Sequence, residues 1–114
     1  MRDIHVSSIT EAVAQACMSA NYVLPQDVVH ALENGLAKEE SAIGKDIFCQ
    51  LIENAKIARE ESVPICQDTG FTVIFAKIGQ DAHIVGGNLV DAINEGVRKG
   101  YKEGYLRKSI VAHP

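Results

Sequence analysis

The run PICQDTGFTVIFAKI, residues 64–78, decides the fold, because the periodicity of the chain changes there from helical to extended. Upstream, apolar residues recur every three or four positions, as they do on the buried face of a helix. Pro64 ends that pattern, since the residue before a proline avoids the helical region. Residues 71–78 are mostly β-branched or aromatic and are apolar on both faces. This predicts a strand buried on both sides, reached through a polar loop at residues 66–70.

Helices are predicted upstream of this run. The first spans about residues 8–21, where Ser8 and Glu11 form a capping box and apolar residues follow at helical spacing. The second starts near Pro25, which suits the first turn of a helix, and Gly35 weakens its end. The third is the longest, at about residues 41–60, and carries one broad apolar face. That face consists of Ile43, Ile47, Phe48, Leu51, Ile52, Ala55 and Ala58.

A small sheet and one more helix are predicted downstream. Residues 82–85 follow a turn and are expected to pair with the strand at 71–78. Asn88 is a good N-cap for a helix that ends near Gly100 or Gly104. The chain therefore reads as one α+β domain, with a helix-rich N-terminal half followed by a small sheet and a further helix. The apolar face of the last helix is expected at Val90, Ile93, Val97 and Tyr101.

The composition excludes several classes of protein. Apolar residues make up 46% of the chain, which argues against intrinsic disorder. The net charge of −4 and the absence of Trp argue against nucleic-acid binding by phosphate attraction or base stacking. No apolar run approaches the roughly 20 residues that a membrane-spanning helix needs. Three cysteines without tight spacing indicate a reducing cytoplasm rather than a disulfide framework.

The loop at residues 66–70 carries the side chains that are best suited to catalysis or ligand binding. Cys66 can bind a soft metal centre or act as a nucleophile, and Asp68 can move protons. Gln67 both donates and accepts hydrogen bonds, and Gly70 permits a sharp turn. The residues alone leave a plainer interpretation open, in which Cys66 is a small buried hydrophobe and Asp68 caps a turn.

The seven residues PICQDTG at 64–70 resemble the signature of the α part of the class I (iron–sulfur) fumarases and of the related tartrate dehydratases. Residues 79–87 and 104–109 also resemble the α chain of two-subunit fumarate hydratases. The likeness runs from the first predicted helix to Pro114 and so covers nearly the whole chain.

This resemblance implies a [4Fe–4S] cluster that three cysteines hold, with one iron left open as a Lewis acid. Cys66 matches the first of those cysteine ligands. Gln67 and Asp68 match residues that contact the dicarboxylate substrate, and Asp68 is also a candidate for proton transfer. Arg107 matches an arginine that binds a substrate carboxylate, which a planar guanidinium does better than an ammonium group.

The resemblance also implies reversible hydration of fumarate to malate, a step of the tricarboxylic acid cycle, with tartrate dehydration as the alternative. Residues 1–114 are then expected to be the N-terminal part of an α subunit, inactive alone. Its partners are the remainder of the α subunit, a β subunit or domain, and further copies in a homo-oligomer. The other ligands and the catalytic base are expected outside this chain, because Cys17 and Cys49 lie inside helical patterns.

Other interpretations follow from the residues themselves. A cysteine-nucleophile enzyme would use Cys66 with His83 as its base, and a non-catalytic assembly module would use neither. Cys17 lies on an apolar helical stripe and is expected in the core, whereas Cys49 is expected to be a partly covered structural thiol. The four histidines are scattered, so no zinc site is expected.

Overall fold

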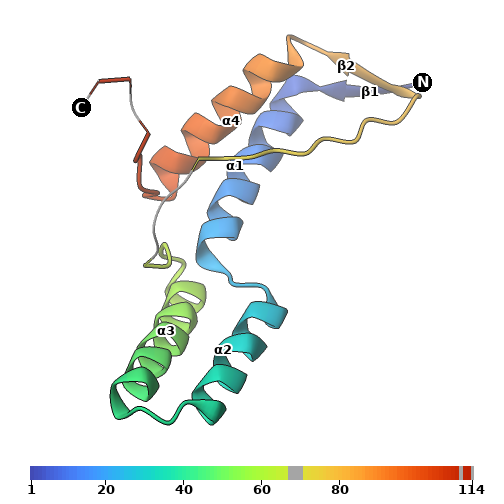
Figure 1. Ribbon diagram of the computed structural model, residues 1–114. Helices are drawn as coiled ribbons and strands as arrows, with labels where there is room; N and C mark the ends of the chain where they lie inside the picture. Colours follow the sequence, from blue (N-terminus) through green and yellow to red (C-terminus); the bar gives the residue numbers. More distant parts are fainter. Residues whose placement is uncertain (67–70, 111, 114) are drawn as a thin grey trace. The chain divides into compact units, whose positions relative to one another are not determined.

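The computed structural model of the protein describes residues 1–66, 71–110 and 112–113 (Figure 1). Its architecture is the expected α+β arrangement of helices with a two-stranded sheet. None of the helices in the described ranges is long and apolar enough to cross a membrane. The chain forms two compact units, residues 1–19 with 68–114 and residues 20–67. The elements in order are β1 (Arg2–His5), α1 (Val6–Tyr22), α2 (Gln26–Lys38), α3 (Ala42–Glu61), β2 (Ala82–Val85) and α4 (Leu89–Glu103).

The sheet of the first unit pairs the N-terminus of the chain with β2. Strands β1 and β2 are parallel, with Arg2 opposite Ala82 and His5 opposite Val85. Sequence reasoning did not predict β1, and the expected pairing of residues 82–85 with 71–78 is wrong. In both places a four-residue strand leads quickly into a helix, which places α1 and α4 on a common layer (Figure 1).

Helix α1 begins at Val6, two residues before the expected start at Ser8. His5 ends β1, and its ring nitrogen Nδ1 accepts a hydrogen bond from the Ser7 N–H at 3.2 Å. The predicted capping box of Ser8 and Glu11 is therefore wrong. The Glu11 carboxylate instead pairs with the Lys99 ammonium of α4.

Helices α1 and α4 run side by side and meet through very small side chains. A Cβ atom placed on Gly96 would lie only 2.6 Å from the Thr10 carbonyl oxygen, and one on Gly100 only 2.7 Å from that of Ala14. The Thr10 hydroxyl donates to the Ala92 carbonyl at 3.0 Å. The core of the first unit therefore depends on small residues rather than on the large apolar stripe expected for α4.

The stripe expected on α4 is only partly covered. Val90 is 61% exposed, and Ile93, Val97 and Tyr101 are half-buried. The buried residues of the helix are Ala92, Gly96 and Gly100. The helix boundaries themselves are as expected, since the Asn88 side chain accepts hydrogen bonds from the backbone of the first turn and the helix ends at Gly104.

Residues 71–78 are extended, but the prediction that they form a strand is wrong (Figure 1, yellow). One face of the segment points into the first unit, where the Thr72 hydroxyl donates to the Tyr101 hydroxyl at 3.1 Å. The opposite face is open, with Val73 60% and Phe75 95% exposed. A strand needs hydrogen-bonding neighbours, and the described part of the chain places none beside this segment.

The second unit contains a pair of helices, α2 and α3, which run in opposite directions. Ser41 caps α3 by accepting a hydrogen bond from the Gly44 N–H at 3.3 Å. Gly35 lies in the last turns of α2, which continues to Lys38. The Phe48 ring of α3 lies 2.6 Å from the position of a Cβ on Gly35, so the glycine leaves room for the ring.

The broad apolar face predicted for α3 is divided by burial. Ala55 and Ala58 are buried and Phe48 is half-buried. Ile43 and Ile47, in contrast, are 75% and 52% exposed. Only one side of the predicted face is therefore used inside the second unit.

Candidate active site

The approach to Cys66 is built by the end of α3. Ser62 adopts the left-handed conformation (φ 53°) and ends the helix. The N–H groups of Ser62 and Val63 both donate to the Ala58 carbonyl, which closes the last turn. Pro64 cannot continue α3, because it lacks a backbone N–H and the residue before it avoids the helical region.

Two hydrogen bonds fix the backbone at Cys66. The Ile65 N–H donates to the Asn21 carbonyl at the end of α1, at 2.9 Å. The Cys66 N–H donates to the Asn54 side-chain oxygen on α3, at 3.0 Å. The Cys66 thiol itself is exposed and makes no disulfide. Its plain interpretation as a buried hydrophobe is therefore wrong, and the thiol is presented from a tethered backbone.

Sequence reasoning missed Asn21 and Asn54 as residues that position the backbone of Ile65 and Cys66. A signal for Asn54 was present, because it is a polar residue next to the apolar face of α3, three positions after Leu51 and four before Ala58. A polar amide next to an apolar helix face is explained when its side chain forms a hydrogen bond with a backbone group.

Gln67 and Asp68 lie outside the described residues. Their expected contacts with a dicarboxylate, and the proton transfer expected of Asp68, remain predictions.

Arg107 follows a tight turn after α4. Tyr105 is left-handed (φ 54°), and the Leu106 N–H donates to the Tyr101 carbonyl at 3.1 Å. The Leu106 side chain is buried, which fixes the turn, whereas Arg107 is exposed. Among the described residues the guanidinium has neither a hydrogen bond nor an ion pair, so it is available to an anion.

A groove of about 760 Å³ lies beside this turn in the first unit. Lys108 and Ser109, the residues after Arg107, line it together with Arg98 and Lys102 of α4. Its apolar lining residues include Phe71. Arg98 is neutralised in part by Glu95, one turn earlier on α4. The cationic lining contrasts with the net charge of −4 on the whole chain and favours anions locally.

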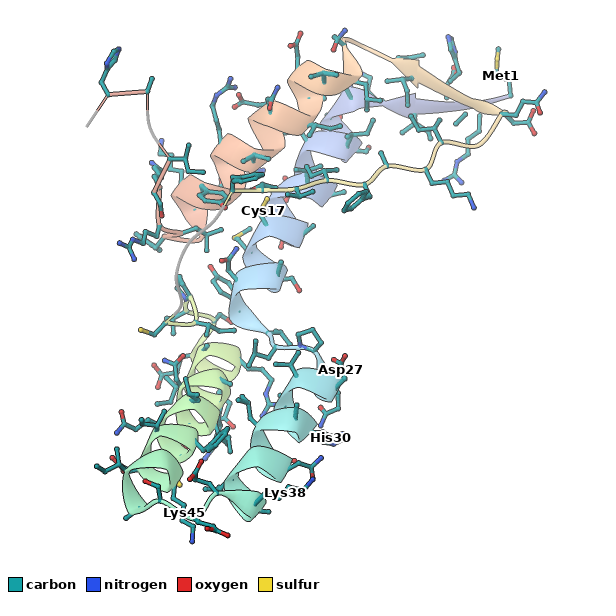
Figure 2. The ribbon with its side chains drawn as sticks, in the orientation of Figure 1. Met1, Cys17, Asp27, His30, Lys38 and Lys45 are labelled. Carbon is teal, nitrogen blue, oxygen red and sulfur yellow. The ribbon has the colours of Figure 1, made fainter. Side chains whose placement is uncertain are left out.

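The remaining cysteines differ in environment. Cys17 is buried, as expected, on the side of α1 that faces α4 (Figure 2), and burial raises the pKa of its thiol. Cys49 is exposed on α3 rather than partly covered. In the ranges 1–66, 71–110 and 112–113, no three His, Cys, Asp or Glu side chains gather in a way that could hold a metal ion.

His83 is the base that a cysteine-nucleophile enzyme would require. Its ring lies on β2 in the first unit, where Nδ1 is 3.0 Å from the Asp3 carboxylate of β1. The observed partner of His83 is thus a carboxylate of the neighbouring strand.

Comparison with known proteins identifies the family. The family model described as fumarate hydratase (Fumerase) matches residues 10–114. A Methanocaldococcus jannaschii protein, named provisionally as an L(+)-tartrate dehydratase subunit alpha, is 41% identical over 109 residues, covering 93% of this chain and 37% of that protein. The L(+)-tartrate dehydratase alpha subunits of Escherichia coli K12 and Shigella boydii are each 30% identical over 106 residues, covering 93% of this chain and 35% of theirs.

The chain thus spans little more than a third of the length of the curated relatives that it matches. The family match nevertheless includes almost every residue from α1 to the end, and with it the loop of Cys66 and the turn of Arg107. The chain therefore belongs to the fumarate hydratase (Fumerase) family.

Proposed function

We propose that this chain is the N-terminal, cluster-binding part of a hydro-lyase α subunit that hydrates fumarate reversibly to malate. The observation that carries the proposal is the exposed thiol of Cys66, held on a backbone that Asn54 and Asn21 tether. The family description, fumarate hydratase, and the relatives' name, tartrate dehydratase, both denote enzymes that add or remove water in a four-carbon diacid.

The proposed cofactor is a [4Fe–4S] cluster with Cys66 as one of three protein ligands. Cys66 fits the role of one such ligand, because a thiol must be accessible and rigidly placed to ligate iron. Cys17 does not fit, since it is buried between α1 and α4. The remaining ligands are proposed to come from the part of the α subunit that lies outside this chain. When bound, the cluster supplies a Lewis acid that lowers the basicity of the leaving hydroxyl group.

The residues of this chain are proposed to bind the diacid and to move a proton. Hydration adds a hydroxyl group to one olefinic carbon of fumarate and a proton to the other, and the reverse reaction removes both. Asp68 is proposed to act in the proton transfer and Gln67 to hydrogen-bond a carboxylate of the substrate. Negative charge develops on the carboxylate next to the carbon that loses its proton, so a fixed cation there stabilises the transition state.

Arg107 is proposed to be that cation. Its guanidinium is exposed and has no partner among the described residues, and the buried Leu106 beside it fixes its backbone. The lysines and arginine of the neighbouring groove, Lys108, Lys102 and Arg98, raise the local positive potential further.

A partner subunit is proposed from the relatives, which are named as alpha subunits. The complete enzyme then joins this chain to the rest of an α polypeptide and to a β subunit, in a cytoplasmic homo-oligomer.

The test replaces the matched region of the E. coli alpha subunit with this chain and reconstitutes the purified complex with iron and sulfide without oxygen. We expect brown protein with the broad visible absorbance of a cluster. Cys66→Ser should remove that absorbance and the activity, whereas Cys49→Ser, a second exposed thiol of the same unit, should leave both unchanged. If Cys66→Ser keeps its iron content and activity, the proposed role of Cys66 is refuted.

The substrate is decided in the native enzyme that contains this chain, because most of the chimaeric α subunit is the E. coli protein. Fumarate hydration is expected to exceed L-tartrate dehydration in kcat/KM, and the opposite ratio would assign the chain to the tartrate activity of its named relatives. Arg107→Lys keeps the charge but loses the planar pair of donors, so it should raise KM or lower kcat while cluster absorbance stays constant.

A further inference from the structure

The segment of residues 71–78 has the properties of a strand without its neighbours. Its backbone is extended, and in the part of the chain that the structure describes it belongs to no ladder. A backbone that is left without partners exposes a row of N–H and C=O groups, which is a template for pairing with another chain. The segment is long enough for such pairing, since strands are commonly five or six residues.

The two faces of the segment differ in what covers them. The inner face carries Ile74 and Ile78, which are 40% and 52% exposed and line a hollow of about 290 Å³ together with Ile9 of α1 and Ile93 of α4. Val73 and Phe75, called the outer face here, line neither this hollow nor the groove beside Arg107, and they are 60% and 95% exposed. The helices α1 and α4 therefore cover the segment in part, and the apolar side chains of the outer face are left open.

Soluble proteins rarely leave such a segment bare. Phe75 is almost fully exposed, and Lys77 is the one charged residue among positions 71–78. Apolar residues, β-branched side chains and low charge also form the pattern of an aggregation-prone edge. A partner that pairs with the backbone and covers Val73 and Phe75 would resolve both problems together.

The relatives indicate which partner this is. The chain covers 37% of the M. jannaschii relative and 35% of the E. coli relative, so most of each α polypeptide lies outside the matched region. We infer that residues 71–78 pair with a β-strand from that other part of the α polypeptide, which also covers Val73 and Phe75. This inference rests on family membership and on the open segment, and it does not require the cluster.

The experiment measures amide hydrogen exchange of this chain with and without a defined probe. The probe is the part of the M. jannaschii relative that this chain does not match, produced as a separate polypeptide without added iron. We expect a complex in which the amides of residues 71–78 exchange on the order of 100-fold more slowly than in the free chain.

Paired variants separate strand pairing from general contact. Val73→Pro removes a backbone donor and should weaken binding by at least about 10-fold, whereas Val73→Thr keeps the donor and should bind as the parent does. Phe75→Lys should weaken binding, whereas Val90→Lys, on an apolar residue of the same unit that is 61% exposed, should not. Both Val73 and Phe75 are exposed, so these changes leave the core of the unit intact.

Three results would overturn the inference. The first is a complex in which residues 71–78 stay unprotected or in which Val73→Pro binds normally. The second is amide protection at residues 71–78 in the free chain that increases with protein concentration while the measured mass changes from monomer to dimer. That result would make a second copy of the chain the partner. The third applies if the separate probe does not bind. A fusion protein is then made in which this chain replaces the 109 matched residues of the M. jannaschii relative. Unprotected amides at residues 71–78 in that fusion would refute the pairing. Loss of cluster binding in Cys66→Ser leaves all of these results unaffected.

Discussion

Asn54 shows how one side chain fixes the loop that presents Cys66. Its amide oxygen accepts from the N–H of a residue twelve positions later, after the helix has ended and the chain has turned. Local periodicity does not reveal such a bond, because it exists only once the loop folds back toward α3. The sequence indicated Cys66 as a candidate site residue, but it did not indicate which groups hold the backbone of that residue.

Asn54→Ala is expected to loosen this loop. Loss of the acceptor leaves the Cys66 N–H to water, so the free energy of unfolding should fall by about 0.5–1.5 kcal/mol. The exchange rate of the Cys66 amide should rise more than the rates of amides inside α3. Urea unfolding and amide hydrogen exchange check the two effects.

Gln50→Ala is the matched control for Asn54→Ala. Gln50 lies one turn earlier on α3, and its amide donates to the Asp46 carboxylate on the exposed surface, at 2.9 Å. This change should alter stability by no more than about 0.5 kcal/mol. Equal effects of the two substitutions would show that Asn54 has no special role in the loop.

At the scale of elements, helices were predictable and the sheet was not. The caps Ser41 and Asn88 and the stop before Pro64 are local signals, and each marks a real helix end. Strand β1 has four residues and depends on β2, about 80 positions away in the sequence, so nothing local distinguishes it. The expected strand at 71–78 failed for the same reason, because pairing belongs to neighbours and not to the segment itself.

The close contact of α1 with α4 gives a prediction for Gly96→Ala. A methyl group there would lie 2.6 Å from the Thr10 carbonyl oxygen and 2.7 Å from the Val13 Cβ, and neither can move easily. The clash should cost about 1–3 kcal/mol, more than the roughly 1 kcal/mol that alanine gains over glycine in a helix. Thermal unfolding should therefore show a lower Tm.

Gly44→Ala serves as the control for Gly96→Ala. The nearest atoms to its Cβ belong to the flexible Glu39 side chain, which can rotate away and give up only an exposed hydrogen bond from the Ser41 N–H. This variant of α3 should be neutral or slightly stabilised. An unchanged Tm for Gly96→Ala would mean that α1 and α4 are not in close contact.

At the scale of the whole molecule, an ion pair joins residues 88 positions apart. The Lys99 ammonium on α4 bonds the Glu11 carboxylate on α1 and lowers its pKa below 4.5, and Glu11 in turn raises the pKa of Lys99 above 10.5. The contribution of Glu11 is present above pH 4.5 and is lost as the pH falls through its folded-state pKa. The contribution of Lys99 is present below pH 10.5 and is lost as the pH rises through its own folded-state pKa.

Glu11→Gln is therefore expected to destabilise the protein at pH 7 and to have less effect at pH 3. Salt screens ion pairs at the protein surface. The difference in unfolding free energy between wild type and variant at pH 7 should therefore shrink in 1 M NaCl, where the screening length is only about 3 Å. Urea unfolding of wild type and variant at each pH measures the difference. In a Lys99→Gln background, the effect of Glu11→Gln should depend less on pH, and only the part that comes from the hydrogen bond of the Gln15 amide to Glu11 should remain. A pH dependence as large as in the parent would contradict the pairing.

The sequence by itself determined the helices α1 to α4, the α+β class and the family, because caps, apolar periodicity and the motif at residues 64–70 are local patterns. Only the tertiary structure decided that β2 pairs with β1, that Gly96 and Gly100 form the contact between α1 and α4, and that the Cys66 thiol is exposed on a tethered backbone. These features depend on atoms far apart in the chain, and a short-range pattern carries no information about which distant groups will meet. The exposure of Val73 and Phe75 follows the same rule, since it depends on which elements lie beside them and not on their own residue types.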